Sequence, residues 1–303
     1  MVVKKLVPKK NVAKKEIKEP SQISVRIPGP DELNVPPEKL TDYCICIYGT
    51  KGIGKTSLAA SFPNSFTTMF EPRRRNLSIR MQQLGVPDLD KVKASEADEW
   101  EIFKQYLALA EEDDTVSNVV VDTIDLAYTA ALLSVSVRNG YDHPSQNDKD
   151  YGRTWGKLSQ EVALTFDTFR QNGKGLIFIS HTKERDIEVV DGSTAKMVSP
   201  SAPPACIQYL KQACDFAFFY GYFLGKRALV LRDNEGSIWT GCGVTNRFMQ
   251  PNGKPLNILE MPDDPKLGYQ RLNDAFNNKC WDITTPEDER TTETVSRKPL
   301  KKS

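Results

Sequence analysis

The feature that most constrains the fold is a glycine-rich segment between an apolar run and a short helix. Its sequence, GTKGIGKT, occupies Gly49–Thr56 and fits the pattern G-x-x-x-x-G-K-[ST] in full. Residues 43–48 (YCICIY) are continuously apolar, as expected of a strand buried on both faces, and a helix should follow from Lys55 to about Ser61. A chance glycine turn is the alternative, but this context favours a loop that binds phosphate.

Each position of this loop has an expected task. The glycines let the chain curl so that successive backbone N–H groups point at phosphate oxygens, and the positive end of the helix dipole adds to the attraction. Lys55 would reach the β- and γ-phosphates, and the Thr56 hydroxyl would bind Mg²⁺. The predicted nucleotide-binding residues are Gly49, Thr50, Lys51, Gly52, Ile53, Gly54, Lys55, Thr56 and Ser57. The expected ligands are therefore ATP, or a close relative, and Mg²⁺.

A carboxylate follows a second apolar run. Val119–Val121 leads directly into Asp122. After a phosphate-binding loop such an Asp is expected to hold Mg²⁺ through water, although an Asp in this place is also a common helix cap. Asp125 is the weaker candidate, because it fits the first turn of the next helix. Asp122 is therefore the predicted second magnesium residue, with Thr56 as the first.

Two further strands end in polar residues. The strand ending near Phe70 leads into Glu71, and residues 175–180 lead into His181. Ligands of open α/β sheets bind at the carboxyl ends of strands, so both side chains are candidates to face the γ-phosphate. The alternatives stay open, with Glu71 as a surface carboxylate paired with Arg73–Arg75 and His181 as a hydrogen-bonded edge residue. Arg73–Arg75 could themselves bind phosphate, DNA or a subunit, or form a solvated charge run.

Apolar runs and amphipathic stretches alternate along the middle of the chain. Strands are expected to end near Phe70 and to cover 118–121, 175–180, 215–223, 227–232 and 237–244, with a hairpin at 185–198 turning at Asp191-Gly192. Helices are expected at 96–112, from Ile124 to about Val137, and at 158–172. This alternation predicts an α/β fold with a mostly parallel, twisted sheet covered by helices on both faces.

Composition divides the chain into three parts. Residues 1–40 are rich in Lys and Pro and should form a flexible basic arm, 41–262 the folded core, and 263–303 a polar C-terminal tail. The first 20 residues hold seven lysines against two glutamates, a net charge of +5 in a chain whose net charge is +1. Cysteines are scattered without a CxxC pair, so reduced thiols and a cytoplasmic protein are expected. No apolar run approaches the length that spans a bilayer, so no membrane contact is expected.

The order of these motifs resembles that of RecA-like ATPases, and more narrowly that of phage RecA-like proteins of the Sak-type single-strand annealing group. The resemblance covers about residues 41–260. The matching pieces are GTKGIGKTSLA, MFEP, NVVVDTIDLAY, DYGRTWGKL, GLIFISHTKE and GCGVTNRF. It implies a RecA-like P-loop NTPase core, a ring or filament of identical subunits, and single-stranded DNA as the partner, with a single-strand-binding protein as a possible second one.

The resemblance also implies roles for the catalytic candidates Lys55, Glu71, Asp122, His181 and Arg247. Glu71 would activate water, His181 would sense the γ-phosphate, and Arg247 would reach the nucleotide of a neighbouring subunit. One departure matters, because related hexameric enzymes carry Lys-x-Arg where this chain has Thr245-Asn246-Arg247. With one basic residue missing, activation between subunits could be weak or absent.

Two segments are the expected DNA contacts, since in RecA-like proteins the loops after the second and third core strands face DNA. The first, about 139–157, holds Arg153, Trp155 and Lys157, which suit backbone contact and base stacking. The alternative places Trp155 in the core at a helix start. The second segment, about 182–204, holds Lys183, Arg185 and Lys196, but acidic neighbours give its charged residues a net charge of −1, which argues against strong electrostatic binding.

The expected function is therefore an ATPase of phage DNA recombination, annealing or repair, acting in the host cytoplasm. The alternatives are a DNA-annealing module that binds ATP with little turnover, a nucleotide kinase, and a helicase motor. No arginine-rich lid supports a kinase, and the short chain disfavours a motor.

Overall fold

The computed structural model describes residues 29, 35–72, 77–85, 98–141, 143, 152–188, 194–244, 246–287 and 290. Most of the predicted basic arm, Arg73–Arg75 and the end of the predicted tail lie outside these residues. All the helices and strands of the described residues lie in one compact unit that begins at Pro37.

Among the described residues, nine strands form one twisted sheet in the order β11-β9-β8-β1-β5-β4-β2-β3, with β10 paired to β8. The strands are β1 Cys44–Gly49, β2 Ser65–Met69, β3 Met81–Gln83, β4 Asn118–Asp122, β5 Gly175–Ser180, β8 Phe216–Phe223, β9 Lys226–Val230, β10 Gly241–Cys242 and β11 Ile258–Glu260. From β8 through β3 all neighbouring strands are parallel, whereas β9, β10 and β11 pair antiparallel. The phosphate-binding loop thus follows a strand in the middle of the sheet.

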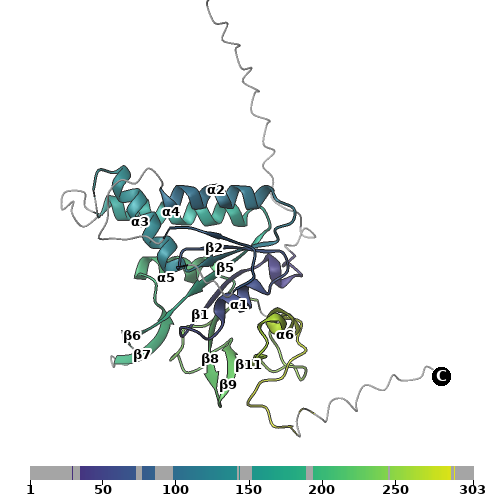
Figure 1. Ribbon diagram of the computed structural model, residues 1–303. Coiled ribbons are helices and arrows are strands. Elements are labelled where there is room, and N and C mark those ends of the chain that lie inside the picture. Colours follow the sequence, from purple (N-terminus) through teal and green to yellow (C-terminus); the bar gives the residue numbers. More distant parts are fainter. Residues whose placement is uncertain are drawn as a thin grey trace, which may run out of the picture. The chain divides into compact units, whose positions relative to one another are not determined.

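Helices cover both faces of this sheet (Figure 1). One face packs against α2 (Glu99–Glu112), α3 (Ile124–Arg138), α4 (Arg153–Arg170) and α5 (Pro204–Ala213), and the other against α1 (Lys55–Ala60) and α6 (Gly268–Phe276). Successive residues of β1 alternate between the two cores, with Cys44, Cys46 and Tyr48 on the side of α2–α5 and Ile45 and Ile47 on the other. This arrangement confirms the predicted α/β fold class.

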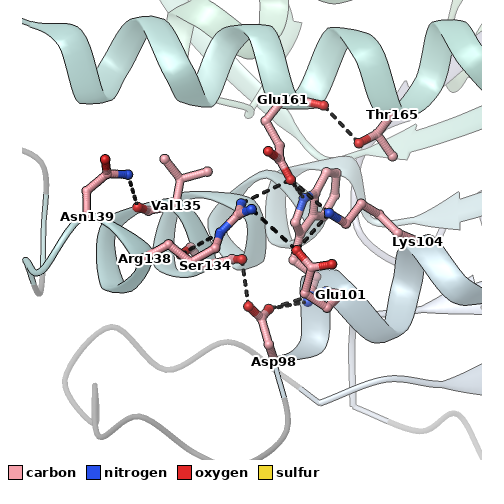
Figure 2. A network of polar contacts seen from close by, with 10 residues as sticks. Asp98, Glu101, Lys104, Ser134, Val135, Arg138, Asn139, Glu161 and Thr165 are labelled. Atoms are coloured by element: carbon pink, nitrogen blue, oxygen red, sulfur yellow. Dashed lines mark hydrogen bonds and ion pairs between the residues drawn. The ribbon is translucent and has the colours of Figure 1, made fainter. Parts of the chain in front are cut away.

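The helices α2, α3 and α4 are joined by one partly buried polar network (Figure 2). The Glu161 carboxylate on α4 accepts hydrogen bonds from Trp100 Nε1 at 3.1 Å and Lys104 Nζ at 3.0 Å, both on α2. Arg138 Nη2 on α3 lies 3.0 Å from the same oxygen. Burial raises the pKa of Glu161, but the bonds from Lys104, Arg138 and Trp100 outweigh it and leave the pKa below the ordinary value.

The network also contains a helix cap. Asp98 precedes α2, and its Oδ1 accepts from the backbone N–H groups of Trp100 and Glu101, at 3.0 and 3.3 Å. Its other oxygen accepts from the Ser134 hydroxyl on α3 at 2.6 Å. The start of α2 is therefore tied to α3 by the residue that caps it.

The fold differs from the sequence prediction at several boundaries. Helix α4 begins at Arg153 rather than near residue 158, and β3, α5, β11 and α6 were not predicted at all. Residues 268–276 fell within the predicted polar tail, yet they form α6, whose Leu272, Ala275 and Phe276 are buried in the core beside α1. Each of these elements has ten residues or fewer, so packing against the rest of the fold stabilises them. The helical spacing of Leu272, Ala275 and Phe276 was a signal for α6 that the prediction missed.

A two-stranded antiparallel ribbon extends from the end of β5. Its strands are β6 (Thr182–Glu188) and β7 (Thr194–Pro200), paired from Thr182 opposite Pro200 to Glu188 opposite Thr194. The predicted hairpin at 185–198 is present and starts three residues earlier than expected; its predicted turn at Asp191-Gly192 lies outside the described residues. The ribbon follows His181 directly in the chain.

Candidate nucleotide-binding site

The glycine-rich loop lies between β1 and α1, as its sequence predicts. At Gly49, the last residue of β1, a Cβ would lie 2.0 Å from the carbonyl oxygen of Tyr220 on neighbouring β8, so only glycine fits. Gly54 precedes α1 with φ of 108°, a left-handed conformation that a side chain disfavours. The two glycines allow the central strand to turn sharply into the helix.

Lys55 points back across the loop instead of into solvent. The residue is 6% exposed, and its Nζ donates to the carbonyl oxygens of Gly49 at 2.8 Å and Thr50 at 3.0 Å. The same nitrogen lies 3.5 Å from Nδ1 of His181. The ammonium group is therefore held above the loop, where phosphate oxygens would be strong acceptors.

Thr56 and Asp122 form the part of the site that suits a magnesium ion. Asp122 is the last residue of β4 and is 1% exposed, and its Oδ2 accepts a hydrogen bond from Thr56 Oγ1 at 2.7 Å. A hydroxyl and a carboxylate are hard oxygen ligands, which Mg²⁺ prefers over nitrogen or sulfur. The donor set of this pair thus fits the predicted ion.

Glu71 and His181 meet across the end of the sheet. His181 Nε2 lies 2.6 Å from Glu71 Oε1, although the two residues come from the ends of different strands, β2 and β5. The predicted alternative partners of Glu71, Arg73–Arg75, lie outside the described residues. Together with Lys55, the pair forms a chain of contacts from the loop to a buried carboxylate.

These side chains surround one cavity of about 240 Å³. It is lined by Gly52, Gly54, Lys55, Thr56, Ser57, Glu71, Leu77, Asp122 and His181. Four of the five predicted catalytic residues therefore face a common space. Ile53 was predicted among the nucleotide-binding residues, but its side chain is buried in the core, so only its backbone is available to a ligand.

Asp125 lies in the first turn of α3, the position that the sequence favoured over a magnesium role. Both its oxygens accept from the Ser180 hydroxyl, at 2.9 and 3.0 Å, and Oδ1 also accepts from the Ser201 hydroxyl at 3.0 Å. Burial raises the pKa of Asp125 above its ordinary value, although these bonds oppose the rise. Asp125 is not among the residues that line the cavity.

Arg247 lies away from the cavity of its own chain. Its guanidinium stacks on the ring of Phe276, 4.2 Å from the centroid, and interacts with Tyr43, the residue before β1. The loop follows the other end of β1, about 17 Å away for a strand of six residues. Arg247 therefore cannot act on the nucleotide of its own subunit, and its action on a neighbouring subunit stays a prediction.

Arg227 is a basic residue near the loop that the sequence did not reveal. Its Nη1 lies 3.9 Å from the place a Cβ on Gly54 would occupy, and its guanidinium interacts with Tyr220 and Tyr222 on the paired strand β8. Only the adjacency of β8 to β1 brings Arg227 there. That adjacency has no local sequence signal, although the basic Lys226-Arg227 pair after the turn at Leu224-Gly225 was a hint.

Within the first predicted DNA segment, the described residues 152–157 form the start of a helix instead of a loop. Arg153, Trp155 and Lys157 lie in the first turns of α4, because Gly152 in a left-handed conformation begins the helix. Trp155 is 40% exposed and meets His143 edge to face, so it is not the core residue of the alternative interpretation. Lys157 donates to the Asn139 side chain.

The second predicted DNA segment is the ribbon, and one of its three basic residues has a structural role. Arg185 donates to Ser199 Oγ at 2.9 Å and to the Ala202 carbonyl at 2.6 Å, so its guanidinium ties the ribbon to the chain that follows it. Lys196 pairs with Glu184 at 3.7 Å, and Lys183 is exposed. The prediction of Arg185 as a DNA contact is therefore weakened by its internal bonds.

Comparisons with known proteins define the family. A family model described as an AAA domain (AAA_24) matches residues 41–238, which include every residue that lines the cavity but not Arg247. A search of curated proteins finds no match. Among the described residues, no helix has both the length and the apolar character needed to span a bilayer. The match is to the broad domain and not to the annealing group of the narrower resemblance. With more than half of its residues matched and a P-loop ATPase core, the chain belongs to the AAA domain family AAA_24.

Proposed function

We propose that this protein hydrolyses ATP and uses the bound nucleotide to control its contact with single-stranded DNA. The observation that carries the first part is the position of the Glu71–His181 pair opposite the phosphate-binding loop, across one cavity. A P-loop alone suffices to bind a nucleotide but provides no group that orients water. In this site Glu71 can act as the base and His181 as its polar partner, and both line the cavity where the terminal phosphate would lie.

The reaction is the attack of a water oxygen on the γ-phosphorus, which breaks the bond to the β–γ bridging oxygen and yields ADP and phosphate. Glu71 orients that water and accepts its proton. His181 holds the Glu71 carboxylate through its Nε2, and Lys55 offsets the charge that develops on the phosphate oxygens. Thr56 and Asp122 would hold a magnesium ion, which would supply further charge stabilisation when bound.

A steady-state ATPase assay with matched variants tests this part. Lys55→Ala should lose both nucleotide binding and turnover, whereas Glu71→Gln should bind ATP normally and hydrolyse it about 10²–10⁴ times more slowly, the usual range for loss of a general base. Glu112→Gln, an exposed carboxylate of α2, is the control. Full turnover in Lys55→Ala or in Glu71→Gln would contradict the assignment. Tight binding with no turnover in the wild type would favour the annealing module that only binds ATP.

The second part of the proposal, contact with DNA, is supported by where the basic and aromatic residues lie. Helix α4 leads into β5 and so runs back along it, which puts Arg153 and Trp155 at the same edge of the sheet as the nucleotide cavity. The exposed part of the Trp155 ring offers a stacking surface worth about 1–3 kcal/mol per base. The lysines of the first 20 residues add attraction for a phosphate backbone without sequence preference.

Binding of a fluorescent oligonucleotide tests this part. Trp155→Ala should weaken binding of single-stranded DNA about 5- to 100-fold, from the energy of one stacked base. Leu164→Ala removes an exposed apolar side chain further along the same helix and should leave the affinity unchanged. Equal affinities of the two variants, or no binding of the wild type at low salt with an ATP analogue, would refute a DNA-binding role for this surface.

A further inference from the structure

A clamp around one partly buried carboxylate links the nucleotide site to the ribbon. Asp125 on α3 receives the hydroxyl of Ser180, the last residue of β5, at 2.9 and 3.0 Å, and the hydroxyl of Ser201 at 3.0 Å. Ser201 comes directly after β7. One carboxylate therefore binds Ser180, two residues before β6, and Ser201, directly after β7. It ties the chain entering the ribbon to the chain leaving it.

The same clamp fixes the backbone of His181. The carbonyl oxygen of His181 accepts from the Ser201 N–H at 2.9 Å and lies 3.1 Å from Ser180 Oγ, whose single hydrogen is directed to Asp125. The Ser201 N–H also lies 3.2 Å from Ser180 Oγ. His181 is thus held on its main chain by Ser180 and Ser201, while its ring contacts Glu71 and Lys55.

Placing a carboxylate between two serine hydroxyls in a partly buried position is energetically unfavourable. Burial of a charged group costs free energy that neutral hydroxyl donors only partly offset, and burial accordingly raises the pKa of Asp125. Both oxygens lie within hydrogen-bond distance of Ser180 Oγ, and a neutral amide, which has one acceptor oxygen, cannot reproduce that contact. The charge at this position is therefore better explained by a need for rigid geometry at the 180–181 peptide than by stability of the fold.

We propose that Asp125 is a positioning residue for ATP hydrolysis, which acts through Ser180 and Ser201 to hold His181 against Glu71 and to transmit the state of the nucleotide to the ribbon. The inference rests on the proposed hydrolysis of ATP. Asp125 does not touch the cavity, so its effect falls on turnover and on the ribbon and not on nucleotide affinity.

The first test compares affinity with turnover. In Asp125→Asn the charge is removed and one acceptor oxygen becomes an NH₂ group, so the contact of Ser180 with both oxygens is lost, although the remaining oxygen can still accept from Ser201. The dissociation constant of ATP should stay within about twofold of wild type, whereas kcat should fall about 10- to 100-fold, the scale of a misplacement near 1 Å. Ser201→Ala removes one of the two serine hydroxyls and should lower kcat by a smaller factor. It keeps the inference testable if Asp125→Asn folds poorly.

The matched control is Asp98→Asn. Asp98 also accepts from a serine of α3, Ser134, and caps a helix, but it lies outside the cavity. This variant should lower the melting temperature and leave kcat unchanged. A loss of kcat in both variants, in proportion to their loss of stability, would overturn the inference.

A double-mutant cycle separates positioning from packing. His181→Ala should itself lower kcat, and addition of Asp125→Asn to that variant should produce no further loss, because the residue that Asp125 positions is already gone. If the two losses multiply instead, Asp125 acts independently of His181 and the inference fails.

Hydrogen exchange gives a readout independent of turnover. Addition of a non-hydrolysable ATP analogue should slow exchange of the backbone amides in 182–188 and 194–200 in the wild type and not in Asp125→Asn. Equal protection in both would overturn the link to the ribbon. The proposed function fails separately, if the wild type turns over no more ATP than Lys55→Ala.

Discussion

Glu161 is predicted to carry much of the stability of the helical layer, because three donors from two other helices converge on one of its oxygens (Figure 2). The perturbation is a pair of variants, Glu161→Gln and Glu161→Ala. Gln keeps an oxygen for the indole N–H of fully buried Trp100 but loses the charge that pairs with Lys104 and Arg138. Ala loses both.

The expected losses of stability depend on how far the charged side chains are exposed to solvent. Both cations are partly exposed, so each ion pair is worth about 0.5–1 kcal/mol after solvent screening, and Glu161→Gln should cost about 1–2 kcal/mol. Glu161→Ala also leaves a buried donor without an acceptor, which adds about 1–3 kcal/mol. At about 2–4 °C per kcal/mol for a domain of this size, the melting temperature should fall by roughly 2–8 °C for Gln and by a further 2–12 °C for Ala.

Urea and thermal unfolding, followed by circular dichroism, measure these differences. The folded pKa of Glu161 is depressed, so its stabilisation is fully present above the ordinary pKa and is lost as pH falls through the folded pKa. The gap between wild type and Glu161→Gln should therefore be constant near neutral pH and close below about pH 4. A loss in Glu161→Gln no larger than in Glu112→Gln, or a gap that widens in acid, would refute the reasoning.

Further predictions concern the loop, the subunit contact and the arm. Gly49→Ala should lower the free energy of unfolding by more than about 2 kcal/mol, because its Cβ would lie 2.0 Å from a β8 carbonyl oxygen. Gly156→Ala should raise that free energy by about 0.5–1 kcal/mol, because Gly156 lies within α4 and a Cβ there meets no other atom within 4 Å. Urea titration measures both, and equal effects of the two variants would contradict the geometry. Arg247→Ala and Lys55→Ala, each inactive alone, should regain ATPase activity when mixed, and co-assembly without rescue would exclude action between subunits. Deletion of residues 1–20 should flatten the salt dependence of DNA binding, and an unchanged slope would exclude the arm.

The sequence was most informative where the chemistry of the backbone left few choices. The motif at Gly49–Thr56 requires a strand, a tight loop and a helix, and the continuous apolar runs of β1, β4 and β5 suit only strands buried on both faces. Asp122 and His181 follow such runs, so their place at the ligand edge of a parallel sheet could be predicted from the chain alone.

The sequence was least informative where neighbours in space are distant in the chain. Arg227 reaches the loop only because β8 pairs with β1, and the Glu71–His181 contact could be anticipated as proximity but not as a hydrogen bond. The start of α4 was missed because a glycine followed by polar residues is typical of a loop. In the structure Gly152 adopts a left-handed conformation immediately before the helix, which begins at Arg153. Packing, not local propensity, decides these places.

The ribbon of β6 and β7 is anchored a short way along its length. Val198 of β7 donates to the Ser237 carbonyl and accepts from the Trp239 N–H, both at 2.8 Å, so the base of the ribbon is fixed to the segment before β10. Glu184 of β6 lies opposite Val198, and from there to Glu188 the strand runs on for about 13 Å. The outer part of the ribbon therefore reaches well beyond the nucleotide cavity, while its inner part shares the rigid surroundings of His181.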